Sequence, residues 1–362
     1  MIAWKEYKIG DILLLEYGKS LMNYQEGIGL YDVFGTNGKI GKTDKYLYNK
    51  PSIIIGRKGA YREVHFANNP FFVIDTAFYT RNKFEWLDTS FLYYWFKNID
   101  INQMDSGSAI PSTSREEVYD LDILLPDKIE QKSISSILSS LDDKIDLLNR
   151  QNKTLEKMAD TLFRQWFVEE AKEEWKEGVL SDEFDFTMGQ SPSGSSFNEE
   201  GIGIPMYQGN ADFGFRFPER RVFTTDPQRF AQKYDTLVSV RAPVGDQNMA
   251  NEKCCIGRGV AAFRYRKNNE FYSYTYFKLK SLMDGIKQFN ETGTVFGSIG
   301  KSDFENLNIT IPPIEITDKF QKNVKPIDDK IITNVNQIRT LSTMRDTLLP
   351  KLMSGEIRIK MN

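Results

Sequence analysis

Histidine and cysteine are nearly absent from this sequence. It contains one histidine, His65, and two adjacent cysteines, Cys254 and Cys255. A single histidine excludes most Ser–His and Cys–His catalytic arrangements, and no cluster has the spacing of a zinc site. Adjacent cysteines rarely form a structural disulfide. We therefore expect a cytoplasmic protein with reduced thiols that binds neither a metal nor a cofactor itself.

Long apolar runs and an excess of one charge are also missing. No run approaches the 18 residues of a membrane span, and no N-terminal signal is present, so we expect neither secretion nor membrane insertion. Basic residues number 47 and acidic residues 50. A chain this close to neutral has no general affinity for nucleic acid, so any such site must be a local patch.

Catalytic motifs are incomplete. Asn69-Pro70-Phe71-Phe72 is similar to the Asn-Pro-Pro-Phe signature of amino-methyltransferases, but one proline is missing. No glycine-rich turn upstream would hold S-adenosylmethionine, and Gly257-Arg258-Gly259 lacks the further spacing of a phosphate cradle. We predict no catalytic site. The alternative, a stand-alone methyltransferase, would be supported by S-adenosylmethionine binding to the chain alone.

What the sequence does contain is a long stretch, Lys128 to Glu169, that is written twice. Leu141-Asp142-Asp143-Lys144-Ile145 returns 186 residues later as Ile327-Asp328-Asp329-Lys330-Ile331. Met158-Ala159-Asp160-Thr161-Leu162 returns at the same offset as Met344-Arg345-Asp346-Thr347-Leu348. A repeat of half a chain indicates a tandem duplication.

Both copies have the apolar spacing of a coiled coil, with alternating steps of four and three residues. In the first copy the series is Ile134, Leu138, Leu141, Ile145, Leu148, Leu155, Ala159, Leu162 and Trp166; in the second it is Phe320, Val324, Ile327, Ile331, Ile338, Leu341, Leu348 and Leu352. So narrow a seam needs a partner helix, and the other copy is the obvious one.

The polar interruptions of the two seams predict their register. If the helices are antiparallel and facing residue numbers sum to 486, Asn152 meets Asn334 and Trp166 meets Phe320. A buried Asn pair costs stability but can fix register, so we predict that these amides lie within hydrogen-bonding reach. Pro326 should kink or restart the second helix.

The segments between the helices repeat more loosely. Trp175-Lys176-Glu177 matches Trp4-Lys5-Glu6, and Leu237 to Arg241 parallels the buried strand and arginine at Ile53 to Arg57. Phe71 to Tyr79 reads as a second buried strand. The second domain has about fifteen extra residues, for which the loop Ser191 to Gly203 is the expected place.

The expected fold is therefore α+β. Two similar α/β domains are joined by two long helices packed as an antiparallel coiled coil, with the pseudo-twofold symmetry of a tandem duplication. The expected boundaries are 1–126 for the first domain, 127–170 for the central helix, 171–312 for the second domain and 313–362 for the C-terminal helix. The segment Gly355 to Lys360 should return beside the N-terminal domain.

Polar loops supply candidate DNA contacts, because Asn and Gln can pair with adenine, Arg with guanine, and Lys with phosphate. The candidates are Lys19, Asn37, Lys39, Arg57 and Lys58 in the first domain, and Gln190, Gln208, Asn210, Arg220 and Arg241 in the second. Arg62 and Arg216 belong to the same polar segments. A single residue of this kind is more often a solvated loop side chain. Asn37 and Asn210 occupy similar loops, however, and the doubling of Arg57 and Arg241 after similar strands favours a DNA contact, although a duplicated position can equally be structural.

Three segments resemble one family. The repeated Leu-Asp-Asp-Lys-Ile helix with Met158 to Phe167 resembles the central conserved region of type I restriction-modification specificity subunits. Thr347 to Ile357 resembles their C-terminal conserved region, and Gly189 to Ser193 is similar to the turn that opens a target recognition domain. The resemblance implies a non-catalytic subunit whose two target recognition domains each read one half of a bipartite DNA site.

The resemblance also implies partners. The helices would hold the two domains apart and dock two methyltransferase subunits, which bring S-adenosylmethionine and flip an adenine for methylation. Motor-nuclease subunits would join through these. Two alternatives stay open: a coiled-coil protein-interaction scaffold without DNA specificity, and the specificity subunit of a modification-only or type IIB-like system.

Overall fold

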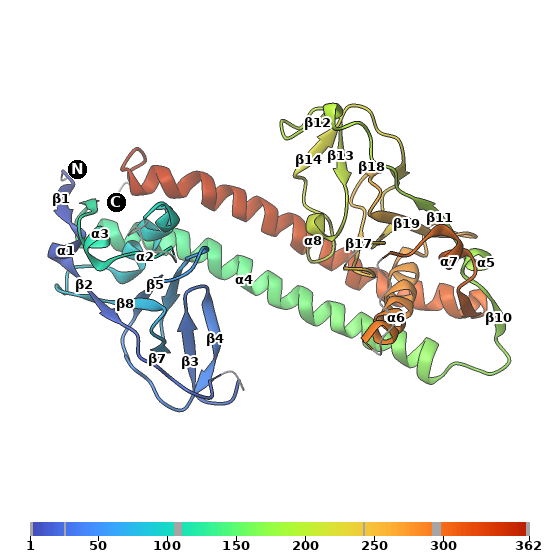
Figure 1. Ribbon diagram of the computed structural model, residues 1–362, viewed down its shortest axis with the longest axis horizontal. Coiled ribbons are helices and arrows are strands. Elements are labelled where there is room, and N and C mark those ends of the chain that lie inside the picture. Colours follow the sequence, from blue (N-terminus) through green and yellow to red (C-terminus); the bar gives the residue numbers. More distant parts are fainter. Residues whose placement is uncertain (1–2, 25–26, 105–110, 242, 292–297, 360–362) are drawn as a thin grey trace. The chain divides into compact units, whose positions relative to one another are not determined.

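The chain folds into short strands, two long helices and several shorter ones (Figure 1). The computed structural model describes residues 3–24, 27–104, 111–241, 243–291 and 298–359, with the backbone alone over 285–291. The residues group into a first unit, 1–149 with 336–362, and a second unit, 150–335. Helices α4 (Lys128–Arg164) and α8 (Ile314–Met353) contribute to both units. In the described part of the chain, no helix has the length and apolar character to span a membrane.

The first unit is built on a four-stranded antiparallel sheet in the order β2-β8-β5-β6. Its strands are β2 (Leu13–Tyr17), β8 (Ala77–Asn82), β5 (Ser52–Gly56) and β6 (Val64–Ala67). Helix α2 (Thr89–Lys97) packs on it, with Phe91, Leu92 and Phe96 fully buried. The Asp88 side chain caps α2 by accepting a hydrogen bond from the Phe91 N–H at 2.8 Å.

A second, three-stranded sheet has the order β4-β3-β7, from β4 (Gly38–Thr43), β3 (Tyr31–Gly35) and β7 (Phe71–Val73). The single strand predicted from Phe71 to Tyr79 is therefore wrong: β7 and β8 belong to different sheets. A tight turn separates them, in which the Ala77 N–H donates to the Ile74 carbonyl at 3.2 Å. The remaining elements are β1 (Lys5–Lys8), which pairs with β9 (Asp122–Leu125), α1 (Ile9–Ile12), η1 (Ile101–Gln103) and α3 (Arg115–Tyr119).

The second unit repeats this plan, which confirms the prediction of two similar domains. Its four-stranded sheet has the order β11-β19-β16-β17, from β11 (Phe184–Met188), β19 (Val260–Tyr265), β16 (Thr236–Ser239) and β17 (Gln247–Met249). Helix α6 (Tyr272–Glu291) takes the place of α2. Strand β10 (Lys176–Val179) pairs with β20 (Asn308–Ile311), as β1 does with β9, and α5 (Leu180–Glu183) and α7 (Lys301–Glu305) flank them.

The other sheet of the second unit is longer, with the order β12-β14-β13-β18-β15. Its strands are β12 (Phe197–Asn198), β14 (Val222–Thr224), β13 (Ile204–Tyr207), β18 (Cys254–Ile256) and β15 (Phe230–Ala231). The connection from β3 to β4 is only Thr36 and Asn37, whereas that from β13 to β14 runs from Gln208 to Arg221 and includes η4 (Asn210–Asp212). Most of the extra residues therefore lie after β13 and not in Ser191 to Gly203, which holds the short turn η3 (Gly194–Ser196). The change in offset between the two repeats gives the number of inserted residues but not their position in the domain.

The two long helices pair antiparallel within each unit. In the second unit, Asn334 Nδ2 donates to Asn152 Oδ1 at 2.9 Å, and the rings of Trp166 and Phe320 lie 6.0 Å apart. In the first unit, Arg345 Nη1 lies 2.7 Å from Asp142 Oδ1. Residue numbers on α8 fall as those on α4 rise, and the first two contacts have the predicted register.

Helix α8 continues through Pro326, so the helix does not restart there, and a kink at Pro326 stays a prediction. Proline removes one helical N–H, which leaves the carbonyl four residues earlier without its partner. Pro326 and Lys322 are both exposed, so water can satisfy that carbonyl. Val324 and Ile331 on either side are fully buried in the seam and hold the helix in place. At its own C-terminus, α4 continues into a π-helical turn, η2 (Gln165–Glu169).

The last described segment returns to the N-terminal strand, as predicted. Arg358 Nε lies 2.6 Å from Glu130 Oε1, and its guanidinium lies 5.5 Å from the centre of the Trp4 ring. Ile359 packs on the core of the first unit. Lys360 lies outside the described residues.

Candidate nucleic-acid interface

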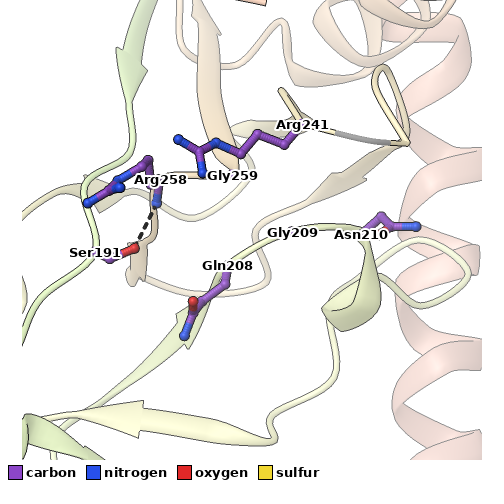
Figure 2. Close-up of a pocket in the computed structure, with 7 residues that line it drawn as sticks. All are labelled: Ser191, Gln208, Gly209, Asn210, Arg241, Arg258 and Gly259. Carbon is purple, nitrogen blue, oxygen red and sulfur yellow. Dashed lines mark hydrogen bonds between the residues drawn. The ribbon is translucent and has the colours of Figure 1, made fainter. Parts of the chain in front are cut away.

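A depression of about 400 Å³ opens on the second unit where four chain segments converge (Figure 2). The segments follow β11, β13 and β16 and include the turn between β18 and β19. The lining residues are Ser191, Gln208, Gly209, Asn210, Arg241, Arg258 and Gly259. The structure thus gathers three predicted residues, Gln208, Asn210 and Arg241, with Arg258, which was not predicted.

Backbone hydrogen bonds hold this depression in shape. The Arg258 N–H donates to Ser191 Oγ at 3.1 Å, and the Val240 N–H donates to the Gly259 carbonyl at 2.9 Å. A Cβ atom on Gly259 would lie 2.1 Å from the Gln208 carbonyl oxygen. Only glycine permits that approach. The surface is therefore fixed before any ligand arrives.

The side chains around the depression can donate to anions and to base edges. Arg241 and Arg258 are exposed, and neither has an ion-pair partner among the described residues. Figure 2 shows Arg241 directed toward Arg258, and the Gln208 and Asn210 amides directed away from each other. Asn210 Nδ2 lies 3.4 Å from Asp246 Oδ2. Two adjacent guanidiniums with amides nearby suit phosphate, guanine and adenine edges.

The first unit brings four of its predicted residues together from the corresponding segments. The Lys19 N–H donates to the Val73 carbonyl, and the Arg57 N–H to the Thr76 carbonyl, both at 2.9 Å. Thr36, next to Asn37 in the β3–β4 turn, donates through Oγ1 to the Lys58 carbonyl at 2.8 Å. Lys19, Asn37, Arg57 and Lys58 therefore belong to one surface.

Tyr17 and Arg115 join this surface, although no sequence pattern points to them. The Arg57 and Arg115 guanidiniums lie 4.8 Å and 4.3 Å from the centre of the Tyr17 ring. Arg57 Nη1 also donates to the Asp75 carbonyl at 3.1 Å. A tyrosine ring in contact with two guanidiniums orients both cations.

Three predicted candidates are not gathered into these surfaces. Lys39 Nζ pairs with Asp32 Oδ2 at 2.7 Å, and Arg220 pairs with Glu252 at 2.6 Å. The Gln190 N–H donates to the Ile256 carbonyl at 3.0 Å, which holds this residue beside the depression without lining it.

Two arginines from the polar segments are buried and have structural contacts instead. Arg62 is 2% exposed and donates to the carbonyls of Ile101, Asn102 and Met104. Arg216 is 1% exposed and pairs with Glu156 of α4 and with Asp328 of α8. Reading these two as surface contacts was wrong, because sequence alone does not distinguish a solvated arginine from a buried, paired one.

Buried titratable groups lie away from both surfaces. Burial raises the pKa of Glu183 to about 7, although the Tyr274 hydroxyl donates to its Oε1 at 2.8 Å. Burial also raises the pKa of the Cys254 thiol, which favours the unreactive thiol form. Over the described residues, no three His, Cys, Asp or Glu side chains are grouped as a metal site requires.

Comparisons with known proteins agree on one family. The model of the type I restriction modification DNA specificity domain matches residues 1–157 and again 172–341. The putative type I restriction enzyme MjaX specificity subunit of Methanocaldococcus jannaschii is 33% identical over 298 residues, which cover 77% of this chain and 70% of that one. The MjaIX specificity subunit of the same organism is 26% identical, over 98% of this chain and 89% of that one.

A solved structure supports the fold. The crystal structure of the type I restriction-modification S subunit from M. genitalium superposes with a TM-score of 0.70. Its sequence is 22% identical, and the match covers 100% of this chain and 97% of that one. The family model matches twice and covers both domains, in agreement with the duplicated topology. The chain belongs to the type I restriction-modification DNA specificity family.

Proposed function

We propose that this chain is the DNA-recognition subunit of a type I restriction-modification complex and that each unit reads one half of a bipartite site. The observation that carries the proposal is a surface built twice from corresponding segments. Asn37 and Asn210 follow the corresponding strands β3 and β13, and Arg57 and Arg241 follow the corresponding strands β5 and β16. Members of a DNA specificity family need two such surfaces to read two half-sites.

The two surfaces differ in chemistry, so they should read different half-sites. The second offers Gln208, Arg241 and Arg258, which suits purine edges in the major groove. The first offers two lysines and the arginines stacked on Tyr17, which combines phosphate positioning with guanine recognition. Partner subunits can supply further phosphate contacts, so near-neutral net charge is compatible with tight binding.

The helices α4 and α8 are proposed as the spacer between the half-sites. They have 37 and 40 residues, which correspond to rods of roughly 55–60 Å at 1.5 Å per residue. Two domains on one face of B-DNA bind about one turn apart, ~34 Å or ~10 bp between centres. The fixed length of the rods would set the gap in the recognised sequence.

Repeated apolar side chains on the helices are the proposed docking faces for two methyltransferase subunits. Met158 and Met344 occupy equivalent places in the repeat and are 51% and 50% exposed. Around Met344 lies an apolar groove of about 570 Å³, lined by Arg339, Thr340, Thr343, Met344, Thr347 and Leu348. Exposed methionines in an apolar groove are typical of protein-binding surfaces.

Native mass spectrometry tests this docking. With the cognate methyltransferase, the unchanged chain should carry two copies, Met158→Glu or Met344→Glu one copy, and the double variant none. Leu147→Glu is the control, because Leu147 is a 40% exposed α4 residue whose repeat counterpart is Thr333. Two bound methyltransferases in the double variant would contradict the assignment.

The chain is proposed to be non-catalytic, with S-adenosylmethionine bound by the methyltransferases and motor-nuclease subunits joining through them. The domains 1–126 and 171–312 would read DNA, and the segments 127–170 and 313–362 would space and dock. Equilibrium dialysis should find S-adenosylmethionine bound by the complex but not by this chain alone. Footprinting of the complex should show one bipartite sequence protected against competitor DNA. Protection without sequence preference would instead favour the protein-interaction scaffold.

A further inference from the structure

The duplication gives the two long helices a choice of partner. Both carry the same apolar seam, so α4 could pair with α8 or with α4 of a second copy. In the observed register, the numbers of facing residues on α4 and α8 sum to 486. Each α8 residue corresponds to the α4 residue 186 positions earlier, so in the equivalent register between two α4 helices the numbers of facing residues sum to 300. Each pair of facing residues forms a layer of the seam, and most layers are apolar in either arrangement. Trp166, for example, contacts Phe320 of α8 in the structure and would face Ile134 between two α4 helices.

The layer formed by Asn152 and Asn334 is different, because the repeat does not duplicate it. At the offset of 186 the counterpart of Asn152 is Ile338, and that of Asn334 is Leu148. In the observed register Leu148, which is 1% exposed, faces Ile338. The seam therefore has one Asn–Asn layer and one Leu–Ile layer at repeat-related positions.

Pairing of like helices would separate these amides. Between two α4 helices each Asn152 would face a leucine at 148, and between two α8 helices each Asn334 would face an isoleucine at 338. Asn152 is 1% exposed and Asn334 0% exposed, so each amide would be buried against an aliphatic side chain and would lose the 2.9 Å hydrogen bond.

The layer is also an unfavourable choice for stability alone. Asn152 Nδ2 and Asn334 Oδ1 have no hydrogen-bond partner among the described residues. Two aliphatic side chains would fill the seam without leaving polar atoms unsatisfied. A buried polar layer that weakens a seam is typical of helices that must choose between similar partners.

We infer that the Asn152–Asn334 pair selects the partner helix: it makes α4 pair with α8 and rejects pairing of like helices from a second copy of the chain. This choice of partner helix is independent of what the surfaces of the two units bind, and it secures the correct assembly of a duplicated chain.

Disulfide trapping between two tagged chains tests the inference. One chain carries Ile145→Cys and the other Leu155→Cys, positions that face each other only between two α4 helices. Within one helix they lie about 15 Å apart, too far for a disulfide. The chains are unfolded, mixed, refolded and oxidised. Chains without introduced cysteines control for Cys254 and Cys255, which are 0% exposed.

Three backgrounds are compared. The first is the unchanged chain, and the second, the double variant, carries Asn152→Leu and Asn334→Ile. The third, the mirror variant, carries these two changes together with Leu148→Asn and Ile338→Asn. The mirror variant moves the amide layer to the repeat-related place and should reject like helices equally well. We expect the double variant to give at least about tenfold more interchain disulfide than the other two, which is about 1.4 kcal/mol in pairing preference. Equal yields in the unchanged and double backgrounds, or a high yield in the mirror variant, would overturn the inference.

Folding is checked in each background by circular dichroism. The double variant replaces buried amides with aliphatic groups and should melt at or above the temperature of the unchanged chain. If it does not fold, Asn152→Leu with Asn334→Leu provides a second apolar layer for the same measurement.

Discussion

Substitution of Arg216 tests how strongly an ion pair stabilises the packing of the β13–β14 connection on α4 and α8. Arg216 belongs to the long β13–β14 connection that the first unit lacks. Its Nη2 pairs with Glu156 and lies 3.3 Å from Asp328 Oδ1, and its guanidinium lies 4.0 Å from the centre of the Tyr276 ring. Arg216→Met keeps the length of the side chain and removes the charge.

The chain contains a matched control in the other half of the repeat. Asp142, the counterpart of Asp328, pairs with Arg345 at 2.7 Å, but these side chains are 32% and 30% exposed. The repeat counterpart of Arg345 is Ala159, which belongs to the second unit and has no charge, so the arginine that pairs with Asp328 comes from the β13–β14 connection instead. The two aspartates thus compare a buried ion pair with a half-exposed one.

The expected effects differ several-fold. Removing Arg216 leaves Asp328, 2% exposed, buried without its counter-ion, which costs about 3–5 kcal/mol. Removing Arg345 breaks a solvent-screened pair worth roughly 0.2–1 kcal/mol. For a unit of this size each kcal/mol lowers the melting temperature by about 2–4 °C. Differential scanning calorimetry should therefore record a loss of roughly 6–20 °C for Arg216→Met and at most about 4 °C for Arg345→Met.

A second substitution separates lost charge from lost packing. Arg216→Met with Asp328→Leu removes both charges and should recover part of the loss, since an apolar pair replaces a buried ion pair without an orphaned carboxylate. If Arg216→Met lowers the melting temperature no more than Arg345→Met does, the buried ion pair does not stabilise the packing of the β13–β14 connection on the helices, which refutes this prediction.

Three further predictions concern pH, helix continuity and DNA contacts. Glu183 has a folded pKa of about 7 against an ordinary 4.5; the folded state then holds the extra proton, so stability falls as pH rises from about 4.5 to 7. Glu183→Gln should flatten urea midpoints measured across that range, and an unchanged slope would refute this. Pro326→Ala should raise the melting temperature by an amount equivalent to ~1–3 kcal/mol, while Ser140→Pro at the repeat-related place in α4 should lower it; no gain from the alanine would show that the seam tolerates proline without cost. Arg258→Ala should weaken DNA binding by the complex and, if it contacts phosphate, lower the salt slope by about 1. Arg220→Ala, which removes an arginine already paired with Glu252, should leave binding within about twofold, and the reverse order would assign the contact to Arg220.

The helices were the most predictable part of the molecule. A seam of alternating steps has only one antiparallel register that brings both polar interruptions together, so Asn152 and Asn334 could be paired from the sequence. Their 2.9 Å hydrogen bond follows from this register, because both residues belong to continuous helices with a fixed rise.

The surfaces were predictable only in part, since they depend on where loops converge. Arg57 and Arg241 were found because duplicated strands end before them. Arg258 was not found, because its role depends on the pairing of β18 with β13, which brings the turn after β18 against Gln208; this long-range pairing has no local signal. The burial of Arg216 could not be predicted either. Its polar loop is typical of a solvated segment, and the side chain becomes fully buried only because that loop packs on both helices.

Methylation-sensitive sequencing of the host genome tests directly whether the chain specifies a bipartite DNA site. The genome should be compared with the gene intact, with the gene deleted, and with the chain carrying Gln208→Ala and Arg258→Ala. We expect a split adenine-methylated motif that disappears on deletion and is relaxed at one half only in the variant, because the changed side chains belong to one unit. A motif that persists without the gene, or one relaxed equally in both halves, would show that the chain does not read DNA through two separate surfaces.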